Sequence, residues 1–217
     1  MNQIAIWLDT FFAPFDSAIL QFMHTIAEKA GVLMTPFMHL VSLTGEKGFM
    51  MLLIALILMC FPKTRKSGIC VFGAVCCGAL FTNIILKPTV CRIRPYEASE
   101  LYRSFWEYTG ATIEGEYSFP SGHTTAAMAG TLALALTRGK KYVWICISYV
   151  ILMGASRNYL MVHYPSDILG GMIAGAAGAI IAYFITKAIY KYATSSPDKK
   201  LSSFVLNADI RNLIKSK

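Results

Sequence analysis

Apolar residues run through this chain in long stretches that are separated by short polar segments. Residues 67–86 carry no charged side chain, and their number matches the roughly 20 residues that an α-helix needs to cross a bilayer. Residues 168–186 are also uncharged. The apolar stretches 124–137 and 142–156 are shorter, and 48–61 becomes long enough to span if its flanks are helical. The pattern predicts five clear spans and therefore an all-α, multi-pass transmembrane helical bundle.

The amino-terminal region has a less regular pattern. Residues 1–16 mix aromatic side chains with Asp9 and Asp16, and Pro14 adds a signal of irregularity, which favours an interfacial segment over a span. Residues 17–43 are apolar but interrupted by charged and polar positions. They form either one imperfect spanning helix or two shorter pieces near the membrane surface. We therefore expect six helices, namely the five clear spans plus an N-terminal span or interfacial helix.

This pattern divides the chain into three parts. Residues 1–44 form the N-terminal interfacial or first-helix region, 45–192 the membrane core, and 193–217 a basic cytoplasmic tail that we expect to be mobile. The amino terminus lacks the basic n-region of a cleaved signal peptide. The first spanning helix is therefore expected to direct insertion.

Small residues repeat along the last predicted span. Gly171 and Gly175 are four positions apart, and so are Ala174 and Gly178. Residues at this spacing share one helix face, where small side chains let two helix backbones approach closely. The last span is therefore expected to pack tightly against its neighbours.

The composition agrees with a membrane protein. Hydrophobic residues make up 55% of the 217 residues, charged residues 15%, and the mean hydropathy is +0.52. The length suits one domain. The net charge of +8 does not indicate nucleic acid, because the cations cluster at the ends of the apolar runs, where they set topology and meet anionic lipid heads. Five of the six cysteines lie inside apolar runs, so neither a disulfide framework nor a metal-ligand spacing is predicted.

The basic residues predict the orientation of the bundle. They gather in two short connections and in the tail: Lys63, Arg65 and Lys66; Arg138, Lys140 and Lys141; and Lys187, Lys191, Lys199, Lys200, Arg211, Lys215 and Lys217. Segments rich in lysine and arginine remain cytoplasmic. If each span crosses once, all three segments fall on one side. The segment 87–123 and the turn around His163 are then on the extracytoplasmic face of the cell membrane.

A cation, an imidazole and a carboxylate occur together where one apolar run ends. Ionisable residues are unfavourable at such a position unless they interact. If the turn at Pro165 opens a helix, Asp167 lies four residues after His163, close enough to orient the imidazole for attack on phosphorus, and Arg157 can bind phosphate oxygens. The alternative is that Arg157 reaches the interface, His163 is an interfacial residue and Asp167 caps a helix.

Two further polar segments border the same outer region. Lys87 and Arg94 can bring two cations to one anion, although this segment taken alone is explained more simply by ordinary juxtamembrane basic residues. Ser121 can cap the helix that follows, Gly122 lets backbone approach a ligand, and His123 can donate a proton to a leaving oxygen. The alternative for this segment is a capped helix start with an incidental histidine.

Together, the three segments predict one phosphate site at the outer face, and their spacing resembles a known signature. The first part of this signature is a lysine, six residues and Arg-Pro, and the second part is Pro-Ser-Gly-His. The third part is Ser-Arg, five residues, a histidine, three residues and an aspartate. The chain thereby resembles the type 2 phosphatidic acid phosphatase superfamily of integral membrane lipid phosphatases. The motifs cover residues 87–167, and the pattern of spans extends the resemblance to about 45–190.

The resemblance implies a role for each matching residue. His163 would be the nucleophile that forms a phosphohistidine, Asp167 its orienting partner, and His123 the acid that protonates the departing oxygen and then activates water. Phosphoryl oxygens would be bound by Lys87, Arg94, Ser121, Gly122 and Arg157. The resemblance implies no metal ion or other cofactor.

The expected partners are a lipid phosphate substrate and the bilayer, with no nucleic acid, and the oligomeric state is left open. Candidate substrates are undecaprenyl diphosphate, phosphatidylglycerophosphate and phosphatidic acid. Two alternatives are a lipid phosphotransferase that uses the same intermediate, with an acceptor site in the aromatic, acidic loop 96–118, and a non-catalytic protein that binds lipid headgroups.

Overall fold

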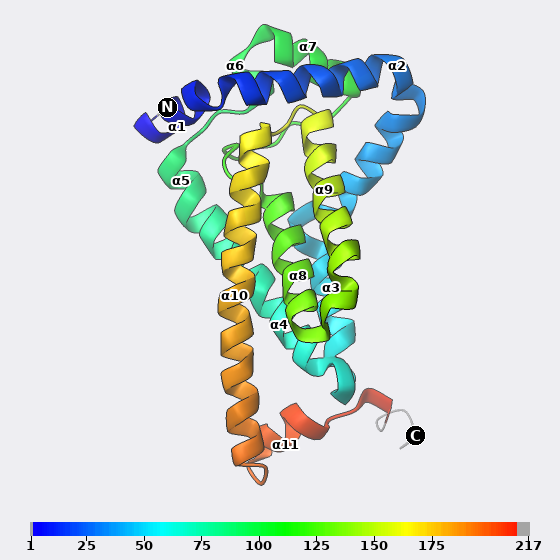
Figure 1. Cartoon of the computed structure of the whole chain (residues 1–217), viewed down its shortest axis with the longest axis vertical. Helices are drawn as coiled ribbons and strands as arrows, with labels where there is room; N and C mark the ends of the chain where they lie inside the picture. The colour runs from blue at the N-terminus through cyan, green and yellow to red at the C-terminus, as the bar shows by residue number, and fades with distance from the viewer. Residues whose placement is uncertain (1, 212–217) are drawn as a thin grey trace.

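The chain folds into an elongated bundle of long helices with shorter helices across one end (Figure 1). The structure, a computed structural model, describes residues 2–211, and this part of the chain contains helices and no strand. The α-helices are α1 (Gln3–Phe11), α2 (Ala13–Gly45), α3 (Phe49–Met59), α4 (Pro62–Ala79), α5 (Lys87–Val90), α6 (Pro95–Ala98), α7 (Glu100–Thr109), α8 (Gly122–Arg138), α9 (Val143–Tyr159), α10 (Pro165–Ser195) and α11 (Lys200–Asn207). A π-helix, η2 (Leu80–Leu86), continues α4, and two short 3₁₀ turns are η1 (Glu46–Gly48) and η3 (Lys140–Tyr142).

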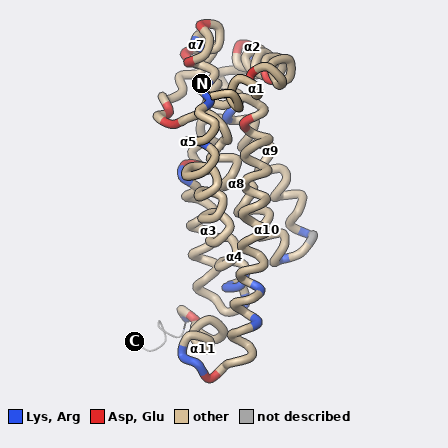
Figure 2. Tube along the Cα trace, turned by 90° about the vertical axis from the view of Figure 1, so that its left-hand side faces the viewer, with Lys and Arg blue, Asp and Glu red and all other residues tan. Residues whose placement is uncertain are grey.

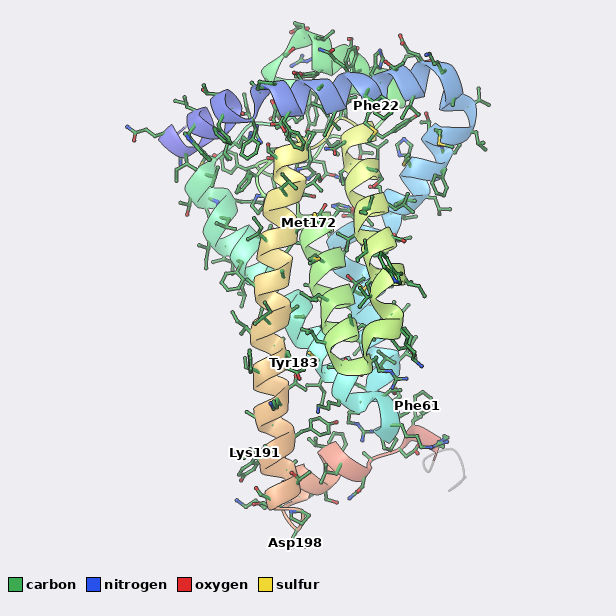
Figure 3. All side chains as sticks on the ribbon, in the orientation of Figure 1. Phe22, Phe61, Met172, Tyr183, Lys191 and Asp198 are labelled. Atoms are coloured by element: carbon green, nitrogen blue, oxygen red, sulfur yellow. The ribbon has the colours of Figure 1, made fainter. Side chains whose placement is uncertain are left out.

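The predicted all-helical transmembrane bundle is confirmed. The five clear spans correspond to α3, to α4 with η2, and to α8, α9 and α10. Within residues 2–211, three helical segments are long and apolar enough to cross a membrane: Ala13–Met59, Pro62–Ala98 and Pro165–Ser195. Charged residues gather toward the two ends of the bundle (Figure 2). Many apolar side chains point outward from it (Figure 3), and large ones such as Phe184 are exposed, as expected where lipid replaces water.

The N-terminal region combines the two alternatives that its sequence leaves open. Residues 17–43 belong to the single helix α2, but Ala30 departs from helical geometry (φ −134°, ψ 15°) and divides it into two limbs. The first limb crosses the end of the bundle, and the second descends beside α9 and leads through η1 into α3 (Figure 1). The irregularity expected near Pro14 is present as a break between α1 and α2 at Phe12, after which Pro14 lies in the first turn of α2, where proline is tolerated.

The three basic segments lie at the end of the bundle away from α1 (Figure 1). The expectation of a mobile tail is wrong for residues 200–207, which form α11. Arg65 is buried beneath this helix, and its Nη1 donates a hydrogen bond to the Val205 carbonyl at 3.2 Å. Residues 212–217, with the predicted cytoplasmic cations Lys215 and Lys217, lie outside the described residues.

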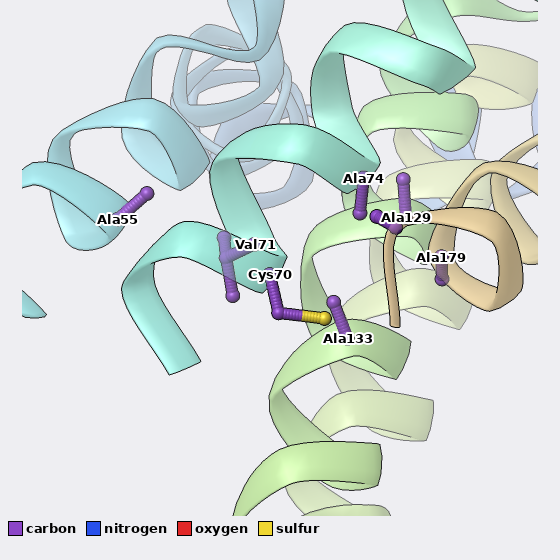
Figure 4. Packing of buried hydrophobic residues seen from close by; sticks show 8 residues of the cluster. Ala55, Cys70, Val71, Ala74, Ala129, Ala133 and Ala179 are labelled. Atoms are coloured by element: carbon purple, nitrogen blue, oxygen red, sulfur yellow. The ribbon is translucent and has the colours of Figure 1, made fainter. Parts of the chain in front are cut away.

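Small residues form the centre of the bundle, as expected for the last span. Cys70, Ala74, Ala129 and Ala133 are fully buried where α4, α8 and α10 meet (Figure 4). Three glycines allow α10 to approach the backbones of α8 and α4 closely. A Cβ atom on Gly171 would lie 2.7 Å from the Ser121 carbonyl, and one on Gly175 would lie 2.5 Å from the Thr125 carbonyl. A Cβ atom on Gly178 would lie 2.8 Å from the Gly78 nitrogen. The close packing predicted from the small residues is confirmed.

Gly178→Ala is expected to destabilise the bundle by about 1–3 kcal/mol, the usual range for overpacking. The added methyl group would meet the Gly78 nitrogen and the Ala74 carbonyl, which belong to the α4 backbone and cannot rotate away. Gly73→Ala is the matched control, because its Cβ would lie 3.4 Å from Ala182 Cβ, close to ordinary contact. Thermal unfolding in detergent measures both variants, and equal loss in the two would contradict the assigned α4–α10 contact.

Candidate active site

A polar cavity of about 380 Å³ lies near the end of the bundle that α1 and α2 cover. It is lined by η1, the α4–η2 segment, the start of α8, the loop 112–116 and the loop before α10. Five of the eight residues predicted for the site line this one cavity: Lys87, Arg94, Gly122, His123 and His163. The three separate sequence segments therefore do meet in the folded chain.

His163 is placed by the tight turn that joins α9 to α10. The residue is 1% exposed, and Arg94 Nη1 lies 3.3 Å from its Nε2. Because a guanidinium group only donates hydrogen bonds, this contact assigns the lone pair to Nε2 and the proton to Nδ1. Burial, together with the positive charges of Arg94, Arg157 and Lys87, holds the pKa of His163 well below its ordinary value of 6.5. The imidazole is therefore neutral near pH 7, with its lone pair at Nε2, where it accepts from Arg94.

Asp167 stands behind this imidazole, in the first turn of α10. Its Oδ2 lies 3.5 Å from His163 Nδ1 and accepts hydrogen bonds from the Tyr164 backbone N–H at 2.8 Å and from Ser118 Oγ. Its Oδ1 accepts from Arg92 Nη1 at 2.7 Å. Asp167 therefore caps the start of α10, as the alternative interpretation of the sequence expects, and also faces the imidazole of His163. One carboxylate can do both because its two oxygens accept several hydrogen bonds.

His123 faces the same cavity from the first turn of α8. Ser121 caps this helix as predicted, since its side chain accepts a hydrogen bond from the Thr124 N–H at 3.4 Å. Ser121 itself is buried and does not line the cavity. A Cβ atom added to Gly122 would meet nothing within 4 Å, so its backbone borders open space. His123 Nε2 lies 3.3 Å from Glu46 Oε2.

Carboxylates of the protein neutralise the predicted phosphate-binding cations. Lys87 forms an ion pair with Glu116, Arg157 donates to Glu114, and Arg94 Nη2 lies 3.7 Å from the same Glu114 carboxylate. Burial opposes ionisation of Glu114, yet the charges of Arg157 and Arg94 hold its pKa at about 2. An anion entering the cavity therefore competes with ionised carboxylates for these cations.

Arg157 occupies a different position from the other predicted cations. It lines a neighbouring cavity of about 210 Å³, and Glu46, Thr112 and Glu114 border both cavities. Lys87 follows directly after η2, whose wider π-helical turns carry Thr82 and Asn83 into the cavity lining. Such π-helical turns occur frequently at functional sites. The backbone irregularity thus lies beside the group of cations.

Sequence reasoning missed three residues that complete this arrangement. Ser118 donates to Asp167, Glu114 joins two arginines, and Arg92 is 1% exposed and bonded to Asp167. Arg92 lies between the predicted cations Lys87 and Arg94, so its location in a charged segment was the only available signal. Ser118 and Glu114 lie in a loop without periodicity, where sequence offers no pairing information.

Fold and site together define a multi-pass, all-helical membrane protein with two imidazoles, a buried aspartate and clustered cations around one polar cavity. The sequence model of the PAP2 superfamily matches residues 68–191, more than half of the chain. The chain therefore belongs to the PAP2 superfamily, which confirms the resemblance found in its motifs.

Named relatives and solved structures agree with this assignment. The chain is 32% identical to lipid A 4'-phosphatase of Porphyromonas gingivalis over 62% of its own length and 57% of that protein. It is 30% identical to undecaprenyl-diphosphatase BcrC of Bacillus subtilis over 63% of its length and 65% of the relative. The matches thus span between half and two thirds of these relatives. The crystal structure of a transmembrane PAP2-type phosphatidylglycerolphosphate phosphatase from Bacillus subtilis has the same fold, with a TM-score of 0.54, 21% identity, and coverage of 90% of this chain and 98% of that one.

Proposed function

We propose that this protein is an integral membrane phosphatase that hydrolyses a lipid phosphate or diphosphate through a phosphohistidine at His163. The observation that carries the proposal is the environment of this imidazole. His163 lines the cavity, its Nε2 lies 3.3 Å from Arg94 Nη1, and Asp167 faces its Nδ1. A neutral imidazole held in one tautomer is a competent nucleophile toward phosphorus. The family membership and the names of the relatives support the same class of reaction.

In the first step, His163 Nε2 attacks the phosphorus atom and the bond from phosphorus to the lipid oxygen breaks. His123, in its protonated form, gives its proton to that oxygen, so the lipid leaves as an alcohol or, from a diphosphate, as a singly protonated monophosphate. The developing imidazolium of His163 keeps its Nδ1 proton directed at the Asp167 carboxylate. Lys87, Arg94 and the backbone at Gly122 stabilise the charge on the phosphoryl oxygens, an electrostatic contribution of several kcal/mol in comparable sites.

In the second step, a water molecule attacks the phosphohistidine. His123 is now neutral and accepts a proton from this water, the nitrogen–phosphorus bond breaks, and inorganic phosphate is released. Both histidines are thereby returned to their starting states. Arg157 completes the binding of the phosphoryl oxygens when the incoming anion displaces the Glu114 carboxylate, and Ser121 holds the start of α8 in place.

The active site is proposed to face the extracytoplasmic side of the membrane. The three basic segments lie at the end of the bundle away from α1, and basic segments remain in the cytoplasm. The phosphate of a lipid reaches the cavity at the level of the headgroups while its apolar chain stays in the bilayer.

A second candidate, phosphate transfer to an acceptor other than water, is favoured by one observation. A cavity of about 630 Å³ adjoins the site and shares Lys87, Glu114 and Glu116 with it. It is also lined by Glu97 and Tyr117, and its size suits a polar headgroup. The acceptor site expected in the loop 96–118 would lie in this cavity.

Phosphate release by the purified protein in detergent tests the proposal. Undecaprenyl diphosphate, phosphatidylglycerophosphate, phosphatidic acid and lipid A are offered in parallel with EDTA present. We expect release from at least one lipid by the wild type and none by His163→Ala. His24→Ala is the matched control, because His24 stacks on Phe105 away from the cavity and its loss leaves the site intact.

Three other outcomes would change the conclusion. Release by His163→Ala at the wild-type rate would overturn the phosphohistidine mechanism. Release only after a lipid or sugar acceptor is added would establish the transferase. Binding of a lipid phosphate without any turnover would establish a headgroup-binding protein.

A further inference from the structure

Arg92 connects the N-terminal helices to the aspartate behind His163. All three nitrogens of its guanidinium group donate to carboxylates: Nε to Asp9 Oδ1 at 2.7 Å, Nη2 to Asp16 Oδ2 at 2.9 Å, and Nη1 to Asp167 Oδ1 at 2.7 Å. Nη1 also donates to Ser166 Oγ at 2.7 Å. One buried cation therefore faces three carboxylates from α1, α2 and α10.

Asp16 is itself held against the first turn of α10. It accepts hydrogen bonds from the Ser166 backbone N–H at 2.8 Å and from Ser166 Oγ at 2.6 Å, and it is 3% exposed. Next to it, Leu20 packs with Met161 and Tyr164 in one apolar cluster. Asp9 and Asp16 both lie outside residues 68–191, the part of the chain that matches the family. The N-terminal segment thus reaches the site through contacts that the family match does not include.

The geometry determines which oxygen of Asp167 faces the imidazole. Because Arg92 binds Oδ1, the carboxylate is held with Oδ2 toward His163 Nδ1. With Asp167 as its sole partner, the positive charge of Arg92 would weaken the attraction between Asp167 and a developing imidazolium at His163. Asp9 and Asp16 offset part of this positive charge, so Asp167 still attracts the imidazolium.

We propose that Arg92 and Asp16 are positioning residues for phosphoryl transfer. Arg92 orients the Asp167 carboxylate, and Asp16 on α2 holds Arg92 in place and offsets its charge. This inference rests on the proposed phosphatase function and extends it to α2, which lies outside the family match. Neither residue lines the cavity, so substrate binding and chemistry respond differently to their replacement.

The test compares Asp16→Asn and Arg92→Lys with wild type in the phosphate-release assay, using the lipid that the wild type hydrolyses fastest. We expect Asp16→Asn to lower kcat by roughly 10- to 100-fold, the range for partners that orient a reacting group through a hydrogen bond. KM and the inhibition constant of inorganic phosphate should stay within about twofold, since the cations of the cavity are unchanged. Rapid-quench measurement with ³²P-labelled lipid should show slower formation of phosphohistidine.

Two further variants separate positioning from a purely structural role. Asp16→Glu restores the charge and should recover part of kcat. Asp9→Asn removes the most exposed of the three partners, with 31% of its side chain exposed, so its effect on kcat should be smaller than that of Asp16→Asn. Asp209→Asn is the control, because it breaks an exposed aspartate–arginine pair in the distant tail and should leave all constants unchanged.

The proposal is overturned if folded Asp16→Asn retains the wild-type kcat, or if kcat of all variants falls only in proportion to the loss of folded protein in thermal unfolding. A parallel rise in KM and in the phosphate inhibition constant would also overturn it, because it would place Asp16 in substrate binding. Failure of the wild type to release phosphate from any lipid overturns the proposed function instead, and the positioning role with it.

Discussion

His123→Ala is expected to accumulate phosphorylated His163 when the substrate carries a good leaving group. A nitrophenolate ion leaves phosphorus without a proton, so the first step proceeds without His123. The second step lacks the base that activates water, and general acid–base catalysis typically contributes 10²- to 10⁴-fold. With p-nitrophenyl phosphate, this variant should show a burst of about one nitrophenolate per protein and then slow turnover, whereas a lipid alkoxide should give no burst.

Stopped-flow absorbance measures the burst, and acid-labile ³²P on the protein measures the intermediate. The position of His123 supports the assignment, because it lines the same cavity as His163 and its Nε2 faces Glu46. His163→Ala is the control and should give neither burst nor label. A burst in that control, or full steady-state turnover in His123→Ala, would contradict the roles assigned to the two histidines.

Arg157→Met should damage both stability and activity, and a second substitution should repair only the stability. Arg157 is 3% exposed and pairs with ionised Glu114, which is left with Arg94 at 3.7 Å when Arg157 is removed. Breaking a buried pair typically costs 3–5 kcal/mol, and we expect about 3 kcal/mol because the Glu114 side chain is 26% exposed. Phosphate release should fall by roughly 10²-fold or more, as when one donor to the transition state is lost.

Glu114→Gln in the same chain removes the unpaired charge and should recover most of the stability, while phosphate release stays low. Thermal unfolding and phosphate release are measured on both single variants and the double variant. The pH dependence gives an internal check. Because the folded-state pKa of Glu114, about 2, lies below its ordinary 4.5, the pair stabilises fully above pH 4.5 and loses this contribution as the pH falls toward 2. Full activity of the double variant would exclude Arg157 from phosphate binding.

The residues of the three motifs were predictable because each lies at the end of an apolar run. When the runs fold side by side as spans, such ends meet at one face of the bundle, and Lys87, His123 and His163 share a cavity there. The close approach of α10 to α4 and α8 was likewise visible in the spacing of Gly171, Gly175 and Gly178. These features depend on local order along the chain.

The contacts of Arg92 were not predictable in this way. Its partners Asp9 and Asp16 are 83 and 76 residues away, and they reach it only because α1 and the first limb of α2 lie across the end of the bundle. Nothing in the pattern of residues 17–43 distinguishes a surface-lying helix from a span. The departure from helical geometry at Ala30 separates the two limbs.

The lengths of the apolar runs and the spacing of the charged motifs thus determine the all-helical bundle, its family and five residues that line the cavity, since helix formation in lipid and the positions of helix ends are local properties. Which carboxylate faces which cation is decided by the path of the folded chain. Glu114 joins Arg157 to Arg94, and Asp16 joins Arg92 to α10, because loops and the kinked α2 bring distant charges together where burial makes pairing necessary.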